Sequence, residues 1–514
     1  MNEERRYGDL SEIREKLSPA ELKFESGRRV VGLFAGPLLF AVLLLMPMHG
    51  LSLQASRLAA IIAWVLVWWV TEAVPIPVTS LLGPALAVFL GVGGAKELFS
   101  AFGNPIIFLF LGSFILAEAM AIHGLDRRIA FGILNLRFVG SSSGRILISF
   151  AVLSAGLSMW LSNSATTAML YPIAMGVLAA FTHLLTKGAA KGEQRFGNAL
   201  MLGTAFAASI GGIVTPVGTP PNLIAEGFLN TLAHRQIPFF QWMVLVFPIA
   251  AVMLVACLVI MRFALPSELK KIKGSGEFFA SERSKLGKWK PGEKNVVFVF
   301  LLAVFLWVLP GVLAVVAGSN SDIYKSAKGF MQESTVAIIA AVLLFILPVN
   351  WKKREFTMTW SRAVRIDWGT LMLFGGGISL GKAMFDTGLA KAIGNGITDA
   401  TGATSVVALT FVFGIVGILF TEVTSNTATA TMLVPLAIAA AQAAGVSPVE
   451  PAIGCALCCS MAFMLPVATP PNAIVYGSGY VRITKMIKLG FWLDLTAAAV
   501  VPLGVVLLTP LVLR

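Results

Sequence analysis

The fold is decided by two near-copies of one stretch, SNSATTAMLYPIA at residues 162–174 and SNTATATMLVPLA at residues 425–437. A second repeated stretch follows each copy in the same order, TPVGTPPNLIAEG at 215–227 and LPVATPPNAIVYG at 465–477. Similar segments that recur in the same order indicate that a chain is built from structural repeats. The sequence therefore predicts two related halves, which meet in a basic segment at 268–294.

The composition places both halves in a membrane. Of the 514 residues, 57% are hydrophobic and only 13% are charged, whereas soluble domains carry about one-quarter charged residues. Apolar runs of about 17 to 25 residues cross the hydrocarbon of a bilayer as helices. Such runs are found at 30–49, 53–72, 75–93, 104–122, 237–263, 294–316, 334–350 and 486–512. We therefore expect an all-α polytopic membrane protein with about 11 transmembrane segments plus two re-entrant hairpins.

The distribution of charge predicts the orientation. The net charge of +13 is compatible with nucleic-acid binding, but the basic residues gather between spans, at 268–294 and 351–365, which is the positive-inside pattern. We expect these segments and the tail at 1–29 in the cytosol, the C-terminus outside, and no nucleic-acid partner. The tail lacks the features of a cleavable signal, so the expected location is the inner (cytoplasmic) membrane. One extra leading helix at 30–49 makes equivalent helices of the halves cross in opposite directions.

Each half contains two apolar segments that polar or Pro-rich residues interrupt. Broken helix at membrane depth must be buried in protein or line a wet cavity. Inverted repeats with paired interruptions indicate a secondary transporter with its site near the bilayer midplane. The predicted domains are a first repeat at 50–265 with hairpin 143–183 and broken helix 197–230, a cytosolic linker at 266–293, and a second repeat at 294–514 with hairpin 402–443 and broken helix 449–480.

The repeated polar triplets stand at the tips of the predicted hairpins. Ser, Asn and Thr supply neutral oxygen ligands, and an unwound tip adds free carbonyls, a combination that can replace the water around a monovalent cation. The same residue types cap helix N-termini, so the arm that follows presents unpaired N–H groups and the positive end of its dipole to an anion. One tip can therefore hold a cation and an anion together.

The repeated Thr-Pro-Pro elements predict helix starts beside those tips. Thr219 and Thr469 are suited to the N-cap, and the Pro that follows each fits the first helical position, where its missing N–H costs nothing. Gly218 and Ala468 leave room for backbone to approach an ion. A single element of this kind more often only kinks or packs a helix, but both elements occur twice, in order, in inverted halves.

These doubled motifs resemble those of the divalent anion:sodium symporter family, whose signatures are two Ser-Asn-Thr motifs on hairpin tips and later Thr-Pro-rich breaks. The resemblance covers essentially the whole chain beyond the tail. It implies a homodimer in which each protomer has a scaffold domain and a mobile transport domain that works as an elevator. It also implies a first sodium site of Ser158, Ser162, Asn163 and Gly218, and a second of Thr421, Ser425, Asn426 and Ala468. The implied substrate contacts are Asn163, Ser164, Thr219, Asn426, Thr427, Thr469 and Pro470.

The first triplet departs from the family pattern, because Ser164 keeps the hydroxyl of Thr but lacks its methyl group. This departure bears on the identity of the substrate more than on the mechanism. Six ionisable residues in or beside apolar segments are further candidates, namely Glu72, Glu118, Lys382, Asp386, Glu422 and Asp494. Glu118 and Lys382 occupy equivalent places in a fainter repeat, where a structural charge pair or a snorkelling position is preferred. Glu422, just before the second tip, is a candidate for tuning cation affinity.

We therefore expect a sodium-coupled symporter for dicarboxylate-type anions such as succinate, malate or fumarate, with Na⁺ as coupling ion and no other cofactor. A sodium-independent dicarboxylate exchanger and a sodium-coupled carrier of citrate or sulfate are alternatives, because helix termini do not by themselves distinguish oxyanions. A membrane-embedded hydrolase would need a nucleophile with a base, or a metal with His or acidic ligands. The sequence shows no such constellation, since Cys455, Cys458 and Cys459 have no nearby His and read as packing residues. No enzymatic activity is expected.

Overall fold

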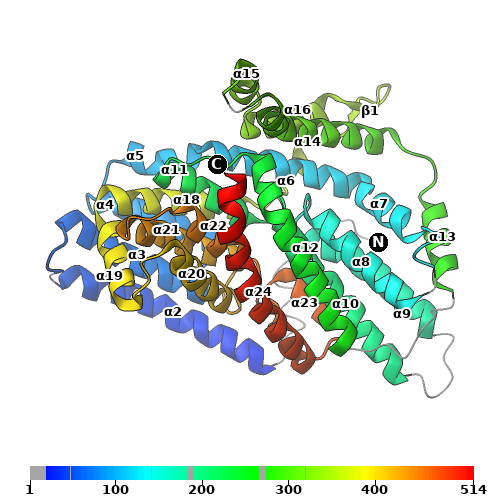
Figure 1. The fold of residues 1–514 in the computed structure, drawn as a ribbon, viewed down its shortest axis with the longest axis horizontal. Helices are drawn as coiled ribbons and strands as arrows, with labels where there is room; N and C mark the ends of the chain where they lie inside the picture. Colours follow the sequence, from blue (N-terminus) through cyan, green and yellow to red (C-terminus); the bar gives the residue numbers. More distant parts are fainter. Residues whose placement is uncertain are drawn as a thin grey trace.

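The fold is taken from a computed structural model that describes residues 19–46, 48–140, 142–182, 190–264, 274–318 and 320–513. Part of the predicted tail at 1–29 and part of the predicted linker at 266–293 lie outside the described residues. Most of the described chain is helical, with one short β-hairpin, and the elements divide between two halves (Figure 1).

The first half begins with one helix that has no counterpart in the second half. Its elements are α2 (Pro19–Leu45), α3 (Leu53–Thr71), α4 (Ile76–Phe89), α5 (Ala95–Phe99), the 3₁₀ helix η1 (Ser100–Gly103), α6 (Pro105–His123), α7 (Leu125–Leu134), α8 (Ser143–Ser158), α9 (Asn163–Thr182), α10 (Ala190–Gly212), α11 (Pro220–Ala233) and α12 (Phe239–Ala264). Helix α13 (Ser275–Lys285) lies between the halves.

The second half repeats this order. Its elements are α14 (Pro291–Ala317), α15 (Asp322–Phe330), α16 (Glu333–Ile346), β1 (Pro348–Asn350), β2 (Glu355–Phe356), α17 (Trp360–Ala363), α18 (Trp368–Asp386), α19 (Leu389–Thr401), α20 (Val406–Thr421), α21 (Asn426–Ala443), α22 (Val449–Cys458), α23 (Pro470–Tyr476) and α24 (Ile483–Val512). Strands β1 and β2 pair antiparallel.

Helical hairpins and broken helices recur in both halves, as the repeated motifs predict. The pairs α8–α9 and α20–α21 form the hairpins, and the pairs α10–α11 and α22–α23 form the broken helices. Each hairpin is preceded by a long helix, α6 or α18, and then by a short connecting helix, α7 or α19, which we call the connecting arm. Both long helices end before a glycine with positive φ, Gly124 at 69° and Gly388 at 79°, a conformation that costs glycine nothing and other residues about 1 kcal/mol or more. The chain therefore turns sharply into each arm.

The leading helix α2 begins earlier than the sequence predicts. It extends back to Pro19, into the stretch expected to be a tail. Arg28 and Arg29 in this extension lie 3.9 and 3.4 Å from the carboxylate of Glu72, which ends α3. Because these charges meet at matching ends of two packed helices, the extension is stabilised by its contacts with α3.

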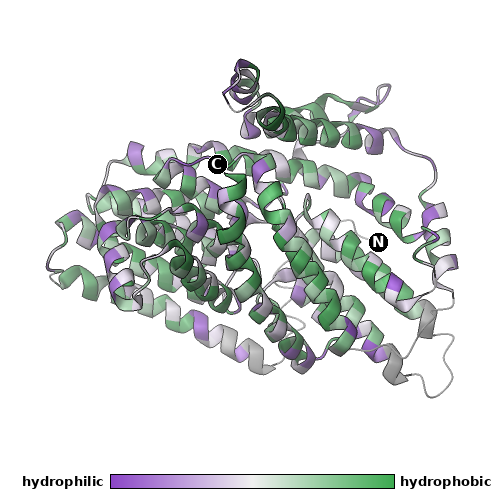
Figure 2. Ribbon diagram, viewed as in Figure 1, coloured by the Kyte–Doolittle hydropathy of each residue, from purple (hydrophilic) through white to green (hydrophobic). Residues whose placement is uncertain are grey.

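Helix lengths agree with a polytopic membrane protein. Within the described residues, six helices are long and apolar enough to cross a bilayer, or up to eight if two bent pairs are each counted as one span. The bent pairs are α15–α16, with an angle of 51°, and α19–α20, with an angle of 94°. Shorter apolar helices are α4, at a predicted crossing, α8 of the first predicted hairpin and α22 of the second predicted broken helix. Figure 2 shows hydrophobic colours along α12, α14 and α24, with hydrophilic residues gathered at α13 and at the β1–β2 turn.

The helices pack into two bodies. We call α8–α12 and α20–α24 the hairpin body, because hairpins, broken helices and the helices that follow them pack mainly on one another. We call α2–α6, α14, α16 and α18 the frame body, because these helices also pack mainly on one another. In Figure 1, α12 and α24 cross the middle of the molecule, α14 and α16 lie along its upper edge, and α3 and α4 lie to the left. The arms α7 and α19 connect the two bodies.

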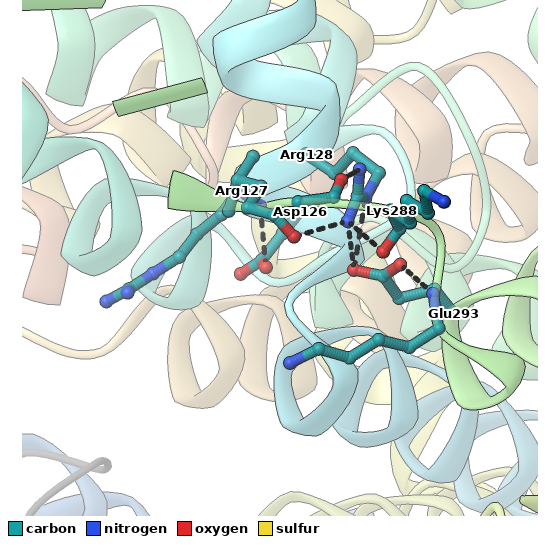
Figure 3. Close-up of polar contacts among 8 residues, drawn as sticks. Asp126, Arg127, Arg128, Lys288 and Glu293 are labelled. Carbon is teal, nitrogen blue, oxygen red and sulfur yellow. Dashed lines mark hydrogen bonds and ion pairs between the residues drawn. The ribbon is translucent and has the colours of Figure 1, made fainter. Parts of the chain in front are cut away.

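A buried ion pair fixes the first arm. Arg128 of α7 donates to Glu293 Oε1 from Nε and Nη2 at 3.0 and 2.9 Å, and also to the backbone carbonyls of residues 286–288 (Figure 3). Its guanidinium lies 4.8 Å from the ring centre of Trp289. Glu293 accepts in turn from the backbone N–H of Lys290 and caps α14. Since the pair is largely buried and hydrogen-bonded on both sides, it ties α7 to the start of α14.

Candidate functional site

The first hairpin tip is the four-residue gap between α8 and α9. Ser158, the last residue of α8, donates from Oγ to Oδ1 of Asn163, the first residue of α9, at 2.7 Å. Ser162 caps α9, and its Oγ accepts from the N–H of Ala165 at 3.2 Å. The cap arises because Ser at this position satisfies an N–H that the helix leaves free. The gap therefore gathers side-chain oxygens and one helix N-terminus.

The break between α10 and α11 closes over this tip. If Gly218 carried a Cβ, it would lie 2.5 Å from the carbonyl oxygen of Gly212 and 2.9 Å from those of Ser158 and Met159. Any Cβ on Gly212 would collide with Oδ1 of Asn163. Three carbonyl oxygens thus lie around the Gly218 backbone and one amide oxygen lies beside Gly212, and only glycine at these two positions leaves the space open. Carbonyl and amide oxygens are ligands for hard cations.

Two further residues of the first half hold the break in place. Thr215 donates from Oγ1 to the carbonyl of Met159 at the tip. Asn222 is fully buried, and the two protons of its Nδ2 are shared among the carbonyls of Gly212, Ile213 and Thr215, which lie 2.8–3.1 Å from that nitrogen. These bonds satisfy carbonyls that the interrupted helix would otherwise leave unpaired in an apolar interior.

The second tip repeats the oxygen pair of the first and adds an acceptor. Thr421 Oγ1 lies 2.6 Å from Oδ1 of Asn426 and 2.7 Å from the carbonyl oxygen of Cys459. A hydroxyl has a single proton, so it satisfies only one of these two acceptors at a time. The Thr421 hydroxyl therefore leaves one of these two acceptor oxygens without its proton, and a bound cation would compensate for this. Ser425 caps α21 without a side-chain hydrogen bond.

The second break uses the same asparagine as the first. Asn472, also fully buried, donates from Nδ2 to the carbonyls of Ala462 and Leu465, both at 3.0 Å. Thr469 caps α23, and its Oγ1 accepts from the N–H of Asn472 at 3.5 Å. Ala468 is buried at the place that Gly218 takes in the first half.

Glu422 ties the second tip to the second break. It is buried, and its two carboxylate oxygens accept from the backbone N–H groups of Met464 and Leu465 at 2.9 and 3.1 Å. The first half has Met159 at the equivalent position. The predicted candidate Glu422 is therefore placed directly beside the second oxygen cluster.

The two halves cross over at the site. Arm α9 of the first hairpin packs against α23 of the second half, and arm α21 of the second hairpin packs against α11 of the first half. The rings of Phe206 and Phe463 are 5.0 Å apart between α10 and the second break. The four interruptions are therefore gathered inside one body, and α9, α11, α21 and α23 all begin there. These four helix N-termini belong to one body, and each of them favours an anion.

The residues expected at the substrate lie at these helix starts. Asn163, Ser164, Asn426 and Thr427 form the first turns of α9 and α21 and are half-buried. Thr219 and Thr469 are the buried N-caps of α11 and α23, and Pro470 at the first position of α23 is exposed. Within each half the described hydrogen bonds link tip to break, whereas the two halves meet through packed helices.

Sequence reasoning missed the four residues that shape the gaps, Thr215, Asn222, Cys459 and Asn472. Asn222 and Asn472 had a signal, because each occupies the same place in the repeated TPPN element. Thr215 had no such signal, because the second repeat has Leu465 at the equivalent position. Cys459 had none either, because it contributes only its backbone carbonyl.

The candidates Lys382 and Glu118 lie on helices of the frame body, α18 and α6. Lys382 pairs with Glu97 and Asp386 at 3.9 Å, and Glu118 is buried on α6. Cys458 and Cys459 pack against Gly414 and Gly417 of α20. The ion pairs of Lys382 and the packing of the two cysteine side chains are structural contacts between helices.

Comparison with known proteins agrees with this arrangement. A family described as the sodium:sulfate symporter transmembrane region matches residues 28–512. A Staphylococcus saprophyticus protein named sodium-dependent dicarboxylate transporter SdcS is 38% identical over 490 residues, covering 94% of this chain and 92% of the relative. A Staphylococcus aureus protein of the same name is 36% identical over 493 residues, covering 95% and 92%.

Two solved structures share the fold at low sequence identity. The YdaH transporter of Alcanivorax borkumensis, described as having an unusual topology, matches with a TM-score of 0.54 and 15% identity and covers 95% of this chain and 98% of its own. MtrF of Neisseria gonorrhoeae, described with a class of antimetabolite efflux pumps, matches with a TM-score of 0.53 and 13% identity, covering 92% and 97%.

Proposed function

The chain belongs to the sodium:sulfate symporter family, and from this premise we propose that it is a secondary transporter that carries a dicarboxylate anion together with sodium ions. The staphylococcal relatives named sodium-dependent dicarboxylate transporters support the substrate class and the coupling ion. Sulfate, which the family description names, and citrate are the competing anions.

The oxygen cluster at each tip is the observation that carries this proposal. At the second tip, Thr421 faces two acceptor oxygens with one proton, and at the first, three carbonyls surround Gly218. Sodium is a hard cation that takes such neutral oxygens in place of water. The first sodium site consists of Ser158, Ser162, Asn163 and Gly218, and the second of Thr421, Ser425, Asn426 and Ala468.

The anion lies between the tips. Its carboxylates face the N-termini of α9 and α21 and accept from Asn163, Ser164, Asn426 and Thr427, with Thr219, Thr469 and Pro470 at the edge of the site. The tip residues themselves carry no cationic side chain, and Arg28 of α2 reaches the second tip at the carbonyl of Val423, to which it donates at 3.0 Å. Bound sodium therefore supplies the positive charge that offsets a divalent anion.

Coupling follows from this arrangement. Sodium orders each tip against its break, and the ordered tips present their N–H groups and the ions' charge to the anion. The anion thus binds the sodium-loaded protein better than the empty one, which is the differential affinity that any ligand-driven shift requires.

The transport cycle uses the two bodies. The hairpin body moves as an elevator against the frame body, which holds a second protomer in a homodimer. The chain lies in the inner (cytoplasmic) membrane, with its N-terminus in the cytosol and its C-terminus outside, as the basic segments at 268–294 and 351–365 favour.

Uptake into proteoliposomes tests the proposal. Purified protein is reconstituted and given labelled succinate, malate, fumarate, citrate or sulfate, each with an inward sodium gradient and with potassium in its place. We expect succinate-type anions to accumulate only with sodium. Equal uptake in both media would overturn the symport, and counterflow in sodium-free vesicles would establish exchange. Accumulation of sulfate but not of dicarboxylates would overturn the substrate class.

A further inference from the structure

The leading helix α2 reaches the second hairpin tip through one side chain. Arg28 donates from Nη1 to the backbone carbonyl of Val423 at 3.0 Å. Val423 lies in the gap between α20 and α21, directly after Glu422 and two residues before Ser425. Since α2 belongs to the frame body and the tip belongs to the hairpin body, this hydrogen bond crosses the boundary between the two bodies.

The carbonyl of Val423 is suited to a cationic donor. Val423 follows the C-cap of α20, where carbonyls have no partner within the helix and the negative end of the helix dipole lies. A guanidinium is always protonated, and its hydrogen bonds are stronger than those of neutral donors. The side chain of Arg28 is only 17% exposed, so water competes little for this carbonyl.

Helix α3 holds Arg28 in place. The guanidinium groups of Arg28 and Arg29 lie 3.9 and 3.4 Å from the carboxylate of Glu72. Glu72 ends α3 with a φ of 48°, in the left-handed region that few residues other than glycine adopt. Gly32 brings α2 and α3 into close contact, because a Cβ there would collide with Oγ1 of Thr71. Arg28 therefore extends toward the tip from two tightly packed helices.

The first tip meets the frame body at the equivalent position. Val423 corresponds to Trp160, since each stands two residues before the repeated Ser-Asn pair. The ring of Trp160 lies 5.3 Å from the ring of Phe300 on α14, edge to face. The first tip thus rests on the frame body through an aromatic side chain, whereas the second is held through a backbone carbonyl. The holding residue of the second tip comes from α2, the helix that has no counterpart in the second half.

We propose that Arg28 is a positioning residue, which seats the second hairpin tip on the frame body in the arrangement seen here. Its bond to Val423 breaks when the tip moves away from α2, so it stabilises this arrangement over the others. Glu72 stays beside Arg28 on the frame body and keeps its charge paired after the tip has left. The inference rests on the proposed function only in taking this movement as a step of transport.

Disulfide trapping tests the seating of the second hairpin. Gly377 of α18 in the frame body faces Thr431 of α21 in the hairpin body, and a Cβ at 377 would lie 3.7 Å from that of Thr431, a separation typical of disulfides. Gly377→Cys/Thr431→Cys is made in a chain whose four native cysteines are replaced by alanine. We expect Arg28→Met, which keeps an unbranched side chain but has no donor, to lower the initial rate of disulfide formation severalfold.

Two further variants separate the hydrogen bond from the ion pair. Arg28→Lys keeps a positive charge and a donor, and we expect it to restore much of the trapping rate. Arg29→Met removes the arginine that lies closer to Glu72, and we expect it to leave the rate nearly unchanged. An unchanged rate in Arg28→Met would overturn the proposal, and so would equal losses in Arg28→Met and Arg29→Met.

A pair within one body is the matched control. Gly454 of α22 and Thr410 of α20 both lie in the hairpin body, and a Cβ at 454 would lie 3.9 Å from that of Thr410. Trapping of Thr410→Cys/Gly454→Cys should not respond to Arg28→Met. An equal fall in this pair would show general loosening of the fold and would overturn the seating role.

The outcomes separate this inference from the proposed function, because trapping needs no transport. Slower trapping in Arg28→Met, in a protein that carries no dicarboxylate, would support the seating role and contradict the function. Sodium-driven uptake together with trapping that is unaffected by Arg28→Met would do the reverse. If Gly377→Cys fails to fold, Asn104→Cys/Thr231→Cys takes its place, because Asn104 at the start of α6 lies 3.4 Å from Thr231 of α11 across the same boundary.

Discussion

The first and second hairpin tips solve one problem with opposite chemistry. In the first half, Thr215 of the break donates to a backbone carbonyl of the tip. In the second half, Glu422 of the tip accepts from two backbone N–H groups of the break. The buried asparagines, Asn222 and Asn472, are the same in both. The two halves therefore repeat the position of the interruption, whereas the side chain that joins the tip to the break differs between them.

The largest effect is expected where the two tips agree. Asn163→Ala and Asn426→Ala should each lower sodium-dependent uptake by about 100-fold or more, because in the proposed sites each amide contacts both an ion and the anion, and each such bond is worth about 1.5–3 kcal/mol. Uptake rates at equal membrane expression measure this. Asn395→Ala, on an exposed face of α19, is the control. If one of the two tip variants transports normally, the tips are not equivalent.

The next effect separates the two sodium sites. Gly218→Ala places a methyl group among three carbonyl oxygens, and overpacking of this kind costs about 1–3 kcal/mol. The sodium concentration for half-maximal uptake should therefore rise about tenfold, while Ala468→Gly changes it less than about threefold. Gly396→Ala is a matched control, because a Cβ there meets no atom within 4 Å. Equal effects at both positions would contradict the geometry.

A third prediction concerns stability rather than transport. Glu422→Ala removes the acceptor for two backbone N–H groups, each costing about 1–3 kcal/mol when left unpaired, whereas Thr215→Val removes one bond worth about 1 kcal/mol. Thermal unfolding in detergent should show a clearly larger drop in Tm for Glu422→Ala, with Glu422→Gln between the two. Similar drops for Glu422→Ala and Thr215→Val would show that the opposite chemistries contribute equally.

The smallest effect is expected at the one difference within the repeated triplets. Ser164→Thr restores the second triplet's pattern in the first tip, and Thr427→Ser does the opposite. Each change moves one methyl group, worth about 0.8 kcal/mol when buried, so KM for succinate should change by about fourfold at most. Initial-rate measurements at saturating sodium test this. A change of preference from dicarboxylate to sulfate would instead show that this methyl group selects the anion.

Much of this architecture follows from the sequence. The repeats predict α8–α9 and α20–α21 as hairpins, and Thr219-Pro220 and Thr469-Pro470 predict the starts of α11 and α23 to the residue. The start of α2 was less predictable, because its extension depends on Glu72 of another helix. Lys382 and Glu118 appear equivalent in the repeats, but Lys382 pairs with Glu97 and Asp386.

The sequence by itself determined the membrane class, the two inverted halves and the four interruptions, because apolar length, capping residues and prolines act locally along the chain. Only the tertiary structure decided that α9 packs on α23 and α21 on α11. It also brought Cys459 to Thr421 and Met464 to Glu422. These contacts join residues far apart in the chain through backbone carbonyls and buried carboxyl groups, and such partners leave no periodic or local pattern in a single sequence.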